Sequence, residues 1–307
     1  MSIGMEFAEM ILAFAIASWF AGYVVDSAIR LSSLLRMKTS VFAFLFVSLS
    51  TSLPELSVAL FSGLRHESAL GFGNLLGSNV VNFCLILGLL AYSGLKVTET
   101  MRKEIMRSAS FVILVSLMVL SSRTIGRALA AVLFILFFFH IYSVGKMFRL
   151  PRIRYFTFTL EFLRDLFIFL LSSIIVVTFS SLGVEAALSF ARDTGILESC
   201  IGASIIAVET SLPELLVATS AVLKRRREVS IGDVTGSNVV NSTLLLGMCA
   251  ALSPVRVSLL ETGIAAFSLI SATLLVFLSS LEKFDRRVSA VLLSFFLIYL
   301  LFLFKFQ

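Results

Sequence analysis

Residues 51–56 read TSLPEL, and residues 210–215 repeat the same six letters. A second phrase follows each copy: GNLLGSNVVN at 73–82 and GDVTGSNVVN at 232–241. Both phrases recur at an offset of 159 residues, with no insertion or deletion between them. Because the phrases keep their spacing, each copy is one structural unit and the chain is an internal duplication.

Each copy places one glutamate, Glu55 or Glu214, inside a long apolar run and directly after a proline. A carboxylate at the centre of a membrane helix costs roughly 2.5–3.5 kcal/mol on insertion scales. The proline leaves the carbonyl four residues before it without its helical donor. A kinked helix with a satisfied glutamate would explain one such copy. Two matched copies of carboxylate, hydroxyls and freed carbonyls instead predict an ion site.

The composition is that of a polytopic membrane protein. Of 307 residues, 58% are hydrophobic and 14% are charged, and the mean hydropathy is +1.02. This is far too apolar for a soluble domain. The three cysteines (Cys84, Cys200 and Cys249) have neither metal-site nor disulfide spacing, and we expect no signal peptide.

Ten apolar runs are long enough to cross a bilayer, five in each copy. They lie near residues 6–29, 40–63, 69–93, 106–122, 125–145, 165–190, 196–222, 230–252, 258–280 and 288–304. The tightest predicted turn, Arg123-Thr124, separates the fourth and fifth runs. The sequence therefore predicts an all-α polytopic membrane protein with ten transmembrane helices. We expect a first five-helix repeat at 1–145, a cytoplasmic linker at 146–164 and a second repeat at 165–307.

The basic residues orient these helices. With the N-terminus outside, nineteen of the 25 Lys and Arg residues fall in inner connections and six in outer ones. Since positive charge gathers on the cytoplasmic side, we expect a plasma-membrane protein with both termini outside. The net charge of +6 then reflects loops near anionic lipid, not nucleic-acid binding. An odd number of helices per copy gives the copies opposite orientations, with the site near the membrane midplane.

Oxygen atoms dominate the predicted site. Neither phrase contains Cys or His, which argues against zinc, copper and iron. Hard oxygen ligands suit calcium, which takes 6–8 oxygens at about 2.3–2.6 Å. Glu55 and Glu214 would each supply both carboxylate oxygens. Backbone carbonyls are expected to complete the shell near Ser48, Thr51, Ala207 and Thr210.

The second phrase supplies polar neighbours on one helical face. Ser78 and Asn82 are four residues apart, as are Ser237 and Asn241, so each pair shares a face. Glycine and asparagine are also common packing residues between membrane helices, so packing alone is the alternative. Duplication of the whole face favours the ligand role.

These paired phrases resemble the α-repeats of the cation/calcium antiporter superfamily, most closely those of the prokaryotic sodium/calcium exchangers. The resemblance covers the whole chain and implies that Ca2+ and Na+ both bind Glu55 and Glu214. It also implies that Asn82 lines the middle of the cluster and that the first and sixth helices slide across a fixed core. The hydroxyl or carbonyl ligands implied by the resemblance are Thr51, Thr210, Ser52, Ser211, Ser78 and Ser237.

Three positions depart from that family's pattern. The glycine that normally precedes Thr-Ser is Ser50 in the first copy and Glu209 in the second. The residue that is Asp in well-known sodium/calcium exchangers is Asn241 here. Asp233 stands where the first copy has the amide of Asn74. The site has thus lost one carboxylate and gained others nearby.

The added carboxylates have open roles. Glu209 lies about 140° from Glu214 around a regular helix, so a ligand or proton-carrying role competes with a packing or rim role. Asp233 is expected behind the ligands or in a vestibule. A further acidic pair at the same offset, Asp26 and Glu185, is interpreted as gate groups or as carboxylates near an aqueous funnel.

The leading interpretation is a sodium-driven calcium antiporter that exports calcium by alternating access, without a prosthetic group, as a monomer. A proton-driven calcium exchanger is the main alternative, because the carboxylate pattern is altered. A cation channel would need a continuous pore, which usually comes from oligomeric symmetry rather than inverted duplication. No Ser/His, paired-Asp or His-rich constellation supports an intramembrane enzyme.

Overall fold

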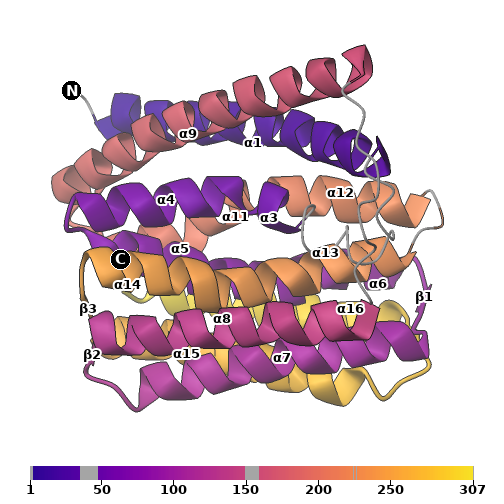
Figure 1. Cartoon of the computed structure of the whole chain (residues 1–307). Helices are drawn as coiled ribbons and strands as arrows, with labels where there is room; N and C mark the ends of the chain where they lie inside the picture. The colour runs from indigo at the N-terminus through magenta and orange to yellow at the C-terminus, as the bar shows by residue number, and fades with distance from the viewer. Residues whose placement is uncertain (1–2, 35–47, 149–158, 224, 226, 307) are drawn as a thin grey trace.

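The computed structural model describes residues 3–34, 48–148, 159–223, 225 and 227–306, and most of them are helical (Figure 1). The first half contains α1 (Ile3–Leu34), α3 (Ser48–Thr51), α4 (Leu53–Leu64), α5 (Ser68–Val80), the π-helix η2 (Val81–Ile86), α6 (Leu87–Tyr92), α7 (Glu99–Leu120) and α8 (Arg127–Phe148). The second half contains α9 (Leu160–Thr194), α10 (Glu198–Ile201), the π-helix η3 (Gly202–Ile206), α11 (Ala207–Thr210), α12 (Leu212–Leu223), α13 (Arg227–Val240), the π-helix η4 (Asn241–Leu245), α14 (Leu246–Leu252), α15 (Leu259–Leu278) and α16 (Arg286–Phe304).

The expected all-helical membrane fold is confirmed at this level. Within the described residues, six helical stretches are long and apolar enough to cross a bilayer: Gly4–Leu31, Ser68–Tyr92, Leu160–Thr194, Glu198–Leu223, Leu259–Leu278 and Arg286–Phe304. The full set of ten spans stays a prediction. The part of the second predicted span at 40–47 lies outside the described residues, as do residues 149–158 of the expected linker. Helices α8 and α9 extend into the two ends of that linker.

Two short antiparallel strand pairs join the halves. Strand β1 (Leu95–Lys96) pairs with β4 (Lys283–Phe284), and β2 (Thr124–Ile125) pairs with β3 (Val255–Arg256). The first pair lies at the opposite end of the helical bundle from the second (Figure 1). Strand β2, in the connection from α7 (which ends at Leu120) to α8 (which begins at Arg127), lies where the tight turn was expected after the fourth span. Strands of two residues are too short to show the alternation that would reveal them in a sequence.

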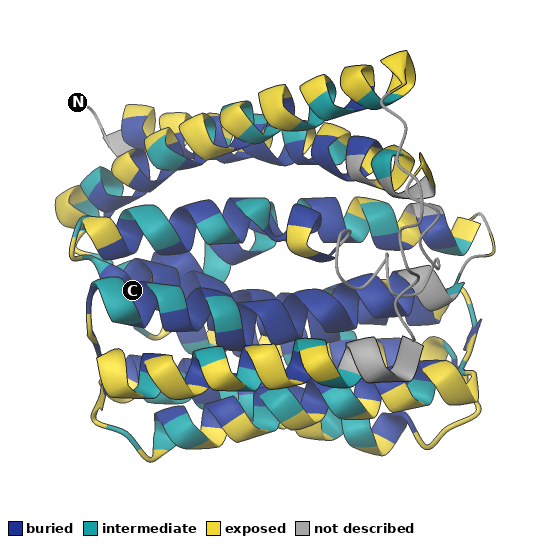
Figure 2. Ribbon diagram, in the orientation of Figure 1, coloured by how far each residue is buried: buried dark blue, intermediate teal, exposed yellow. Residues whose placement is uncertain are grey.

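Helices α1 and α9 pack along each other as a separate outer layer (Figure 1). The helices beneath them surround α5 and α13, which are the most completely buried part of the fold (Figure 2). In the most apolar window of Ser68–Tyr92, 83% of residues are buried, compared with 28% in the window of Leu160–Thr194. The exposed apolar face of α9 is therefore a lipid-facing surface, while α5 lies in the core.

Backbones approach closely where α5 crosses the segment before α11. A Cβ atom on Gly73 would overlap the carbonyl group of Ser199, and one on Gly202 would overlap the carbonyl oxygen of Leu70. Small residues allow such close crossings in membrane helices. This crossing holds the two repeated phrases of the sequence against each other in the middle of the protein.

Candidate functional site

Two helices are interrupted where the repeated phrases lie. Ser52 separates α3 from α4, and Ser211 separates α11 from α12, in each case just before the Leu-Pro-Glu segment. From these breaks, α4 and α12 extend toward opposite ends of the bundle (Figure 1). Proline cannot donate a backbone hydrogen bond, so each break is the local consequence of Pro54 or Pro213. Broken helices of this kind present free backbone and side-chain groups inside membrane transporters.

The Glu214 carboxylate is fully buried and accepts hydrogen bonds from one hydroxyl group of each half. Its Oε1 accepts hydrogen bonds from Ser52 Oγ at 3.4 Å and Ser237 Oγ at 3.2 Å. The Ser237 hydroxyl is also 3.2 Å from Thr51 Oγ1. The second carboxylate oxygen, Oε2, has no hydrogen-bond partner among the described residues.

The Glu55 carboxylate is equally buried but accepts no such bonds from the described residues. Neither of its oxygens has a hydrogen-bond partner within the described chain. Ser211 and Ser78 occupy the positions equivalent to Ser52 and Ser237, yet their buried hydroxyls are likewise unpaired within that same part of the chain. The Thr210 hydroxyl lies beside Glu55 but donates to Asn74 Oδ1 at 3.1 Å. The Glu55 oxygens and both serine hydroxyls are thus buried without hydrogen-bond partners among the described residues.

A third buried carboxylate, Asp233, lies in the same cluster. The charges of Glu55 and Glu214 repel each other, and Asp233 repels both. Asp233 Oδ1 accepts a hydrogen bond from Thr51 Oγ1 at 3.2 Å, and its side chain is fully buried. The Asp233 side chain therefore lies beside the candidate ligand Thr51 and not in an exposed vestibule.

The asparagines of the second phrase cross between the halves. Asn82 Nδ2 donates to Asn238 Oδ1 at 2.8 Å, and Asn79 Nδ2 donates to Ser242 Oγ at 2.8 Å. Asn241 is fully buried, and both of its amide atoms are unpaired among the described residues. The π-helical turns η2 and η4 carry Asn82 and Asn241, and such turns often occur at functional sites.

The remaining predicted residues lie around this cluster. Ser48 O lies 3.2 Å from the Thr51 hydroxyl oxygen, and Ala207 O accepts the Ser211 N–H at 3.3 Å. Glu209 is half-buried, and its carbonyl oxygen accepts a hydrogen bond from Ser18 Oγ of α1 at 2.7 Å. This is the carbonyl that Pro213 deprives of a helical donor. Sequence reasoning missed Ser18, because nothing in the sequence relates it to a carbonyl 191 residues away.

The donor set suits a hard cation bound by mixed oxygen ligands. In the described part of the chain, no three His, Cys, Asp or Glu side chains form a metal-binding group by themselves. Hydroxyl, amide and carbonyl oxygens would have to complete any coordination shell. Unpaired buried oxygens on Glu55, Glu214 and Asn241 are available for this purpose. Calcium and sodium accept such ligands, whereas the softer transition metals prefer nitrogen and sulfur.

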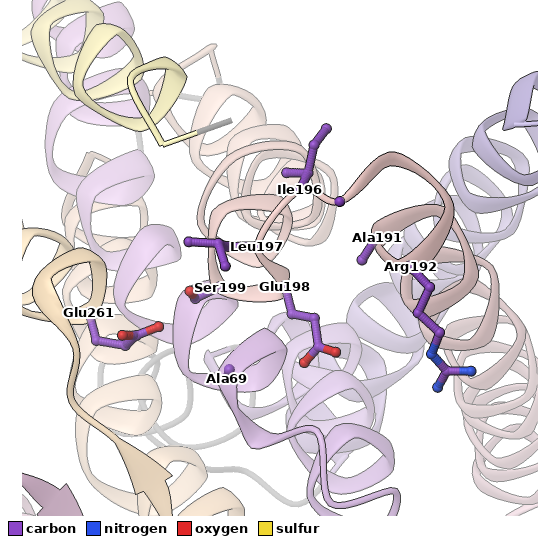
Figure 3. A pocket seen from close by; sticks show the side chains of 9 residues that line it. Ala69, Ala191, Arg192, Ile196, Leu197, Glu198, Ser199 and Glu261 are labelled. Carbon is purple, nitrogen blue, oxygen red and sulfur yellow. The ribbon is translucent and has the colours of Figure 1, made fainter.

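A separate cavity of about 340 Å³ lies where α9 turns into α10. Figure 3 shows Glu198 and Arg192 on one side of it and Glu261 on another. Glu261 is buried and accepts hydrogen bonds from the Ser258 backbone N–H and hydroxyl, which cap α15. This cavity is lined by different residues from the carboxylate cluster.

Comparison with known proteins adds an independent line of observation. A sequence profile of the family described as "Sodium/calcium exchanger protein" matches residues 6–145 and 165–305. The sodium/calcium exchanger MaX1 of Methanosarcina acetivorans is 27% identical over an alignment of 331 positions. The alignment covers 92% of this chain and 93% of that protein. The inner membrane protein YrbG of Escherichia coli is 31% identical over 223 residues, or 68% of each chain.

A solved structure matches the same fold. The sodium-calcium exchanger NCX_Mj, soaked with 2.5 mM Na+ and 10 mM Sr2+, superposes with a TM-score of 0.72. The superposition covers 97% of this chain and 98% of that chain, at 22% sequence identity. The arrangement of helices is therefore shared over nearly the whole length.

Proposed function

The chain belongs to the sodium/calcium exchanger family, and from that membership we propose that it exports calcium across the plasma membrane in exchange for sodium. The observation that carries the proposal is the meeting of Glu55 and Glu214, both fully buried, among unpaired oxygens. Two carboxylates in a membrane interior are costly unless a cation compensates them. Either one calcium ion or several sodium ions can compensate the negative charge of these carboxylates.

This competition is also the basis of coupling. With no cation bound, the bare carboxylates would have to pass through a low-dielectric intermediate, which is unfavourable. The site therefore changes sides only when it is loaded, with either calcium or sodium. Transport of more than two sodium ions per calcium would carry net charge, worth about 2.3 kcal/mol per charge per 100 mV.

Within this proposal, calcium is bound by both glutamates and by oxygens around them. The implied ligands are Thr51, Thr210, Ser52, Ser211, Ser78 and Ser237, with carbonyl groups near Ser48 and Ala207. Asn82 and Asn241 line the adjacent space. We assign Glu209 to the rim of the site, because its carbonyl contacts α1 through Ser18.

We further propose that residues 1–145 and 165–307 form inverted repeats, joined by a cytoplasmic linker at 146–164, with both termini outside. The opposite directions of α4 and α12 support this arrangement (Figure 1). So do the strand pairs, because the segment after α6 and its equivalent after α14 lie at opposite ends of the bundle (Figure 1). Inverted repeats place the substrate near the membrane midplane, where the helix breaks lie.

Helices α1 and α9 are the proposed moving elements. Arg30 Nε of α1 contacts Asp165 Oδ1 of α9 at 3.0 Å, which ties the two helices to each other. An exposed ion pair, Arg65 to Glu185 at 3.2 Å, connects α9 with the core. Because exposed ion pairs are worth at most about 1 kcal/mol, this second contact can break and re-form as the layer slides.

Purified protein in liposomes tests the proposal. Radioactive calcium uptake is measured under an outward sodium gradient, an outward proton gradient, or neither, with potassium and valinomycin to clamp the voltage. We expect uptake to follow the sodium gradient and to be unaffected by a protonophore. Uptake that follows only the proton gradient would replace sodium exchange by proton exchange. Downhill calcium leak without any counter-ion would instead indicate a channel.

A further inference from the structure

The strand pair β1–β4 places two lysines directly opposite each other. Lys96 faces Lys283 in the register of this pair, and Leu95 faces Phe284. Leu95 and Phe284 are buried, so the alternation of a strand directs both lysines to the other, exposed face. Side chains directly opposite each other have Cβ atoms about 4.5–5.5 Å apart, and like charges in such a pair are destabilising. The fold therefore holds two positive charges together at this end of the bundle.

The charge of this lysine pair is not compensated by ion pairs within the described chain. None of the ion pairs among the described residues involves Lys96 or Lys283. Glu99, three residues after Lys96, forms its ion pairs with two other basic residues of α7. Asp285, two residues after Lys283, accepts backbone N–H groups at the start of α16. An anionic group from outside the chain would relieve the repulsion between the lysines.

The surroundings of the lysine pair suit the surface of a bilayer. Lys283 lies over Gly94, where a Cβ atom would be only 3.3 Å from its Nζ atom. Gly94 has a φ of +77°, so the turn into β1 favours glycine at this position. The Arg286 guanidinium lies over the exposed ring of Tyr92, 5.0 Å from its centroid. Tyrosine and basic side chains are enriched at the level of the lipid headgroups, so this cluster has the composition of a headgroup contact.

The β1–β4 pair lies at the end of the bundle where α1 ends and α9 begins (Figure 1). This is the end that we assign to the cytoplasm, because the proposed linker at 146–164 leads into α9. The cytoplasmic leaflet carries anionic lipids, which attract basic residues near its surface. Lipid phosphates accept charge-assisted hydrogen bonds from ammonium groups. An anionic headgroup is therefore the group whose charge and location fit the lysine pair.

The strand pair at the other end shows that the fold does not need these lysines. The positions 159 residues away from Lys96 and Lys283 are Val255 and Thr124. In that β2–β3 pair, Arg256 faces Thr124, so no two like charges oppose each other. The same short strand pair thus forms with one basic residue in the cross-strand position. The facing lysines occur only in the strand pair on the proposed cytoplasmic side.

We propose that Lys96 and Lys283 together bind the phosphate of one anionic phospholipid headgroup in the cytoplasmic leaflet, beside Tyr92 and Arg286. The inference uses the proposed orientation of the chain and does not depend on calcium transport. Lys96 belongs to the first repeat and Lys283 to the second. The bound lipid therefore joins the two halves of the protein at this end of the bundle.

Thermal unfolding of the purified protein in a neutral detergent tests the proposal. Tm is measured while dioleoyl-phosphatidylglycerol, dioleoyl-phosphatidylcholine or sn-glycerol 3-phosphate is added. We expect phosphatidylglycerol to raise Tm, because a ligand that binds the folded state stabilises it. The other two compounds should have no effect at the same concentrations. In the double variant Lys96→Gln/Lys283→Gln, an equal rise should need at least about tenfold more phosphatidylglycerol, since each basic residue near an anionic surface contributes about fivefold.

The matched control is the double variant Lys103→Gln/Arg225→Gln, which removes two exposed basic residues from the same side. Its requirement for phosphatidylglycerol should change less than about twofold, because a specific headgroup contact depends on the residues that touch it. Equal weakening in both double variants would overturn the site in favour of diffuse attraction. A response to phosphatidylcholine equal to that of phosphatidylglycerol would overturn it as well. Equal stabilisation by glycerol 3-phosphate would refute a lipid in favour of a free phosphate.

A second variant tests the repulsion on which the inference depends. Lys96→Glu places opposite charges in the cross-strand position, so it should raise Tm in the absence of lipid and remove the effect of phosphatidylglycerol. An unchanged or lower Tm without lipid would show that the lysines do not repel each other, and would overturn the proposal. None of these measurements involves calcium flux, so their failure would leave the proposed function intact.

Discussion

The Glu214 half and the Glu55 half of the site contain the same residue types in different states. Glu214 accepts hydrogen bonds from Ser52 and Ser237. Glu55 accepts none from the described residues, although the equivalent serines are present with unpaired hydroxyls. The glutamates and serines are the same residue types in both copies, so these residues by themselves do not account for the difference. One oxygen of Glu214 is therefore hydrogen-bonded, whereas both oxygens of Glu55 are unpaired among the described residues.

The largest effect is expected from removing either charge. Glu55→Gln and Glu214→Gln should each reduce sodium-driven calcium uptake to the level of empty liposomes, a loss of at least ~100-fold. An amide keeps the shape but cannot compensate a divalent cation in a low-dielectric site, and a lost ion-pair partner of this kind costs roughly 3–5 kcal/mol. Uptake retained in both variants would show that neither carboxylate belongs to the transport site.

The same two substitutions should differ in their effect on stability. Without calcium or sodium, Glu55→Gln removes a buried carboxylate that lacks donors, so it should stabilise the protein by ~1–3 kcal/mol. Glu214→Gln should give a smaller gain, because it weakens two hydrogen bonds to a charged group. Thermal unfolding in detergent with a calcium chelator measures this difference. Equal shifts in Tm would mean that the two halves are equivalent in the ligand-free protein.

A matched pair of serines sharpens the comparison. Ser237→Ala removes a donor to the Glu214 carboxylate and should destabilise the ligand-free protein by ~2 kcal/mol. Ser78→Ala removes a hydroxyl that is unpaired within the described residues and should leave the ligand-free Tm nearly unchanged. Both variants should weaken calcium binding if both hydroxyls are ligands. The asymmetry would be refuted if Ser78→Ala proved the more destabilising of the two in a chelator.

The smallest effect concerns the contact between α1 and the break in the second half. Ser18→Ala leaves the Glu209 carbonyl without its 2.7 Å donor and should destabilise the protein by ~1 kcal/mol. The equivalent residue in α9 is Val177, which has no hydroxyl, so Val177→Ala should lack this effect beyond the loss of its exposed methyl groups. Ser18→Thr should restore the stability, as measured by thermal unfolding. Failure of that rescue would argue against the hydrogen bond.

Much of this fold follows from the spacing of one repeated phrase. Proline beside glutamate in an apolar run predicted freed backbone carbonyls, and the structure interrupts the helices at Ser52 and Ser211, just before these prolines. The offset of 159 residues also identified which residues are equivalent. The family resemblance is confirmed, whereas the ligand assignments and the inverted orientation of the repeats stay proposals.

Other features depend on contacts between distant segments and left no signal in the sequence. Asp233 was expected behind the ligands or in a vestibule; its burial excludes an exposed vestibule, and its bond to Thr51 depends on how α13 packs against α3. The pairing of Ser18 with a freed carbonyl depends on the position of α1. The short strands arise because two loops of different repeats meet at each end of the bundle.

Calcium binding by purified protein in detergent tests most directly whether Glu55 and Glu214 share one ion. Equilibrium dialysis with radioactive calcium would be carried out on the unmodified protein, on each glutamine variant and on the double variant. We predict one calcium ion per chain in the unmodified protein, loss of binding in either single variant at the same calcium concentration, and no further loss in the double variant. A single variant that still binds one calcium ion with unchanged affinity would contradict the shared site.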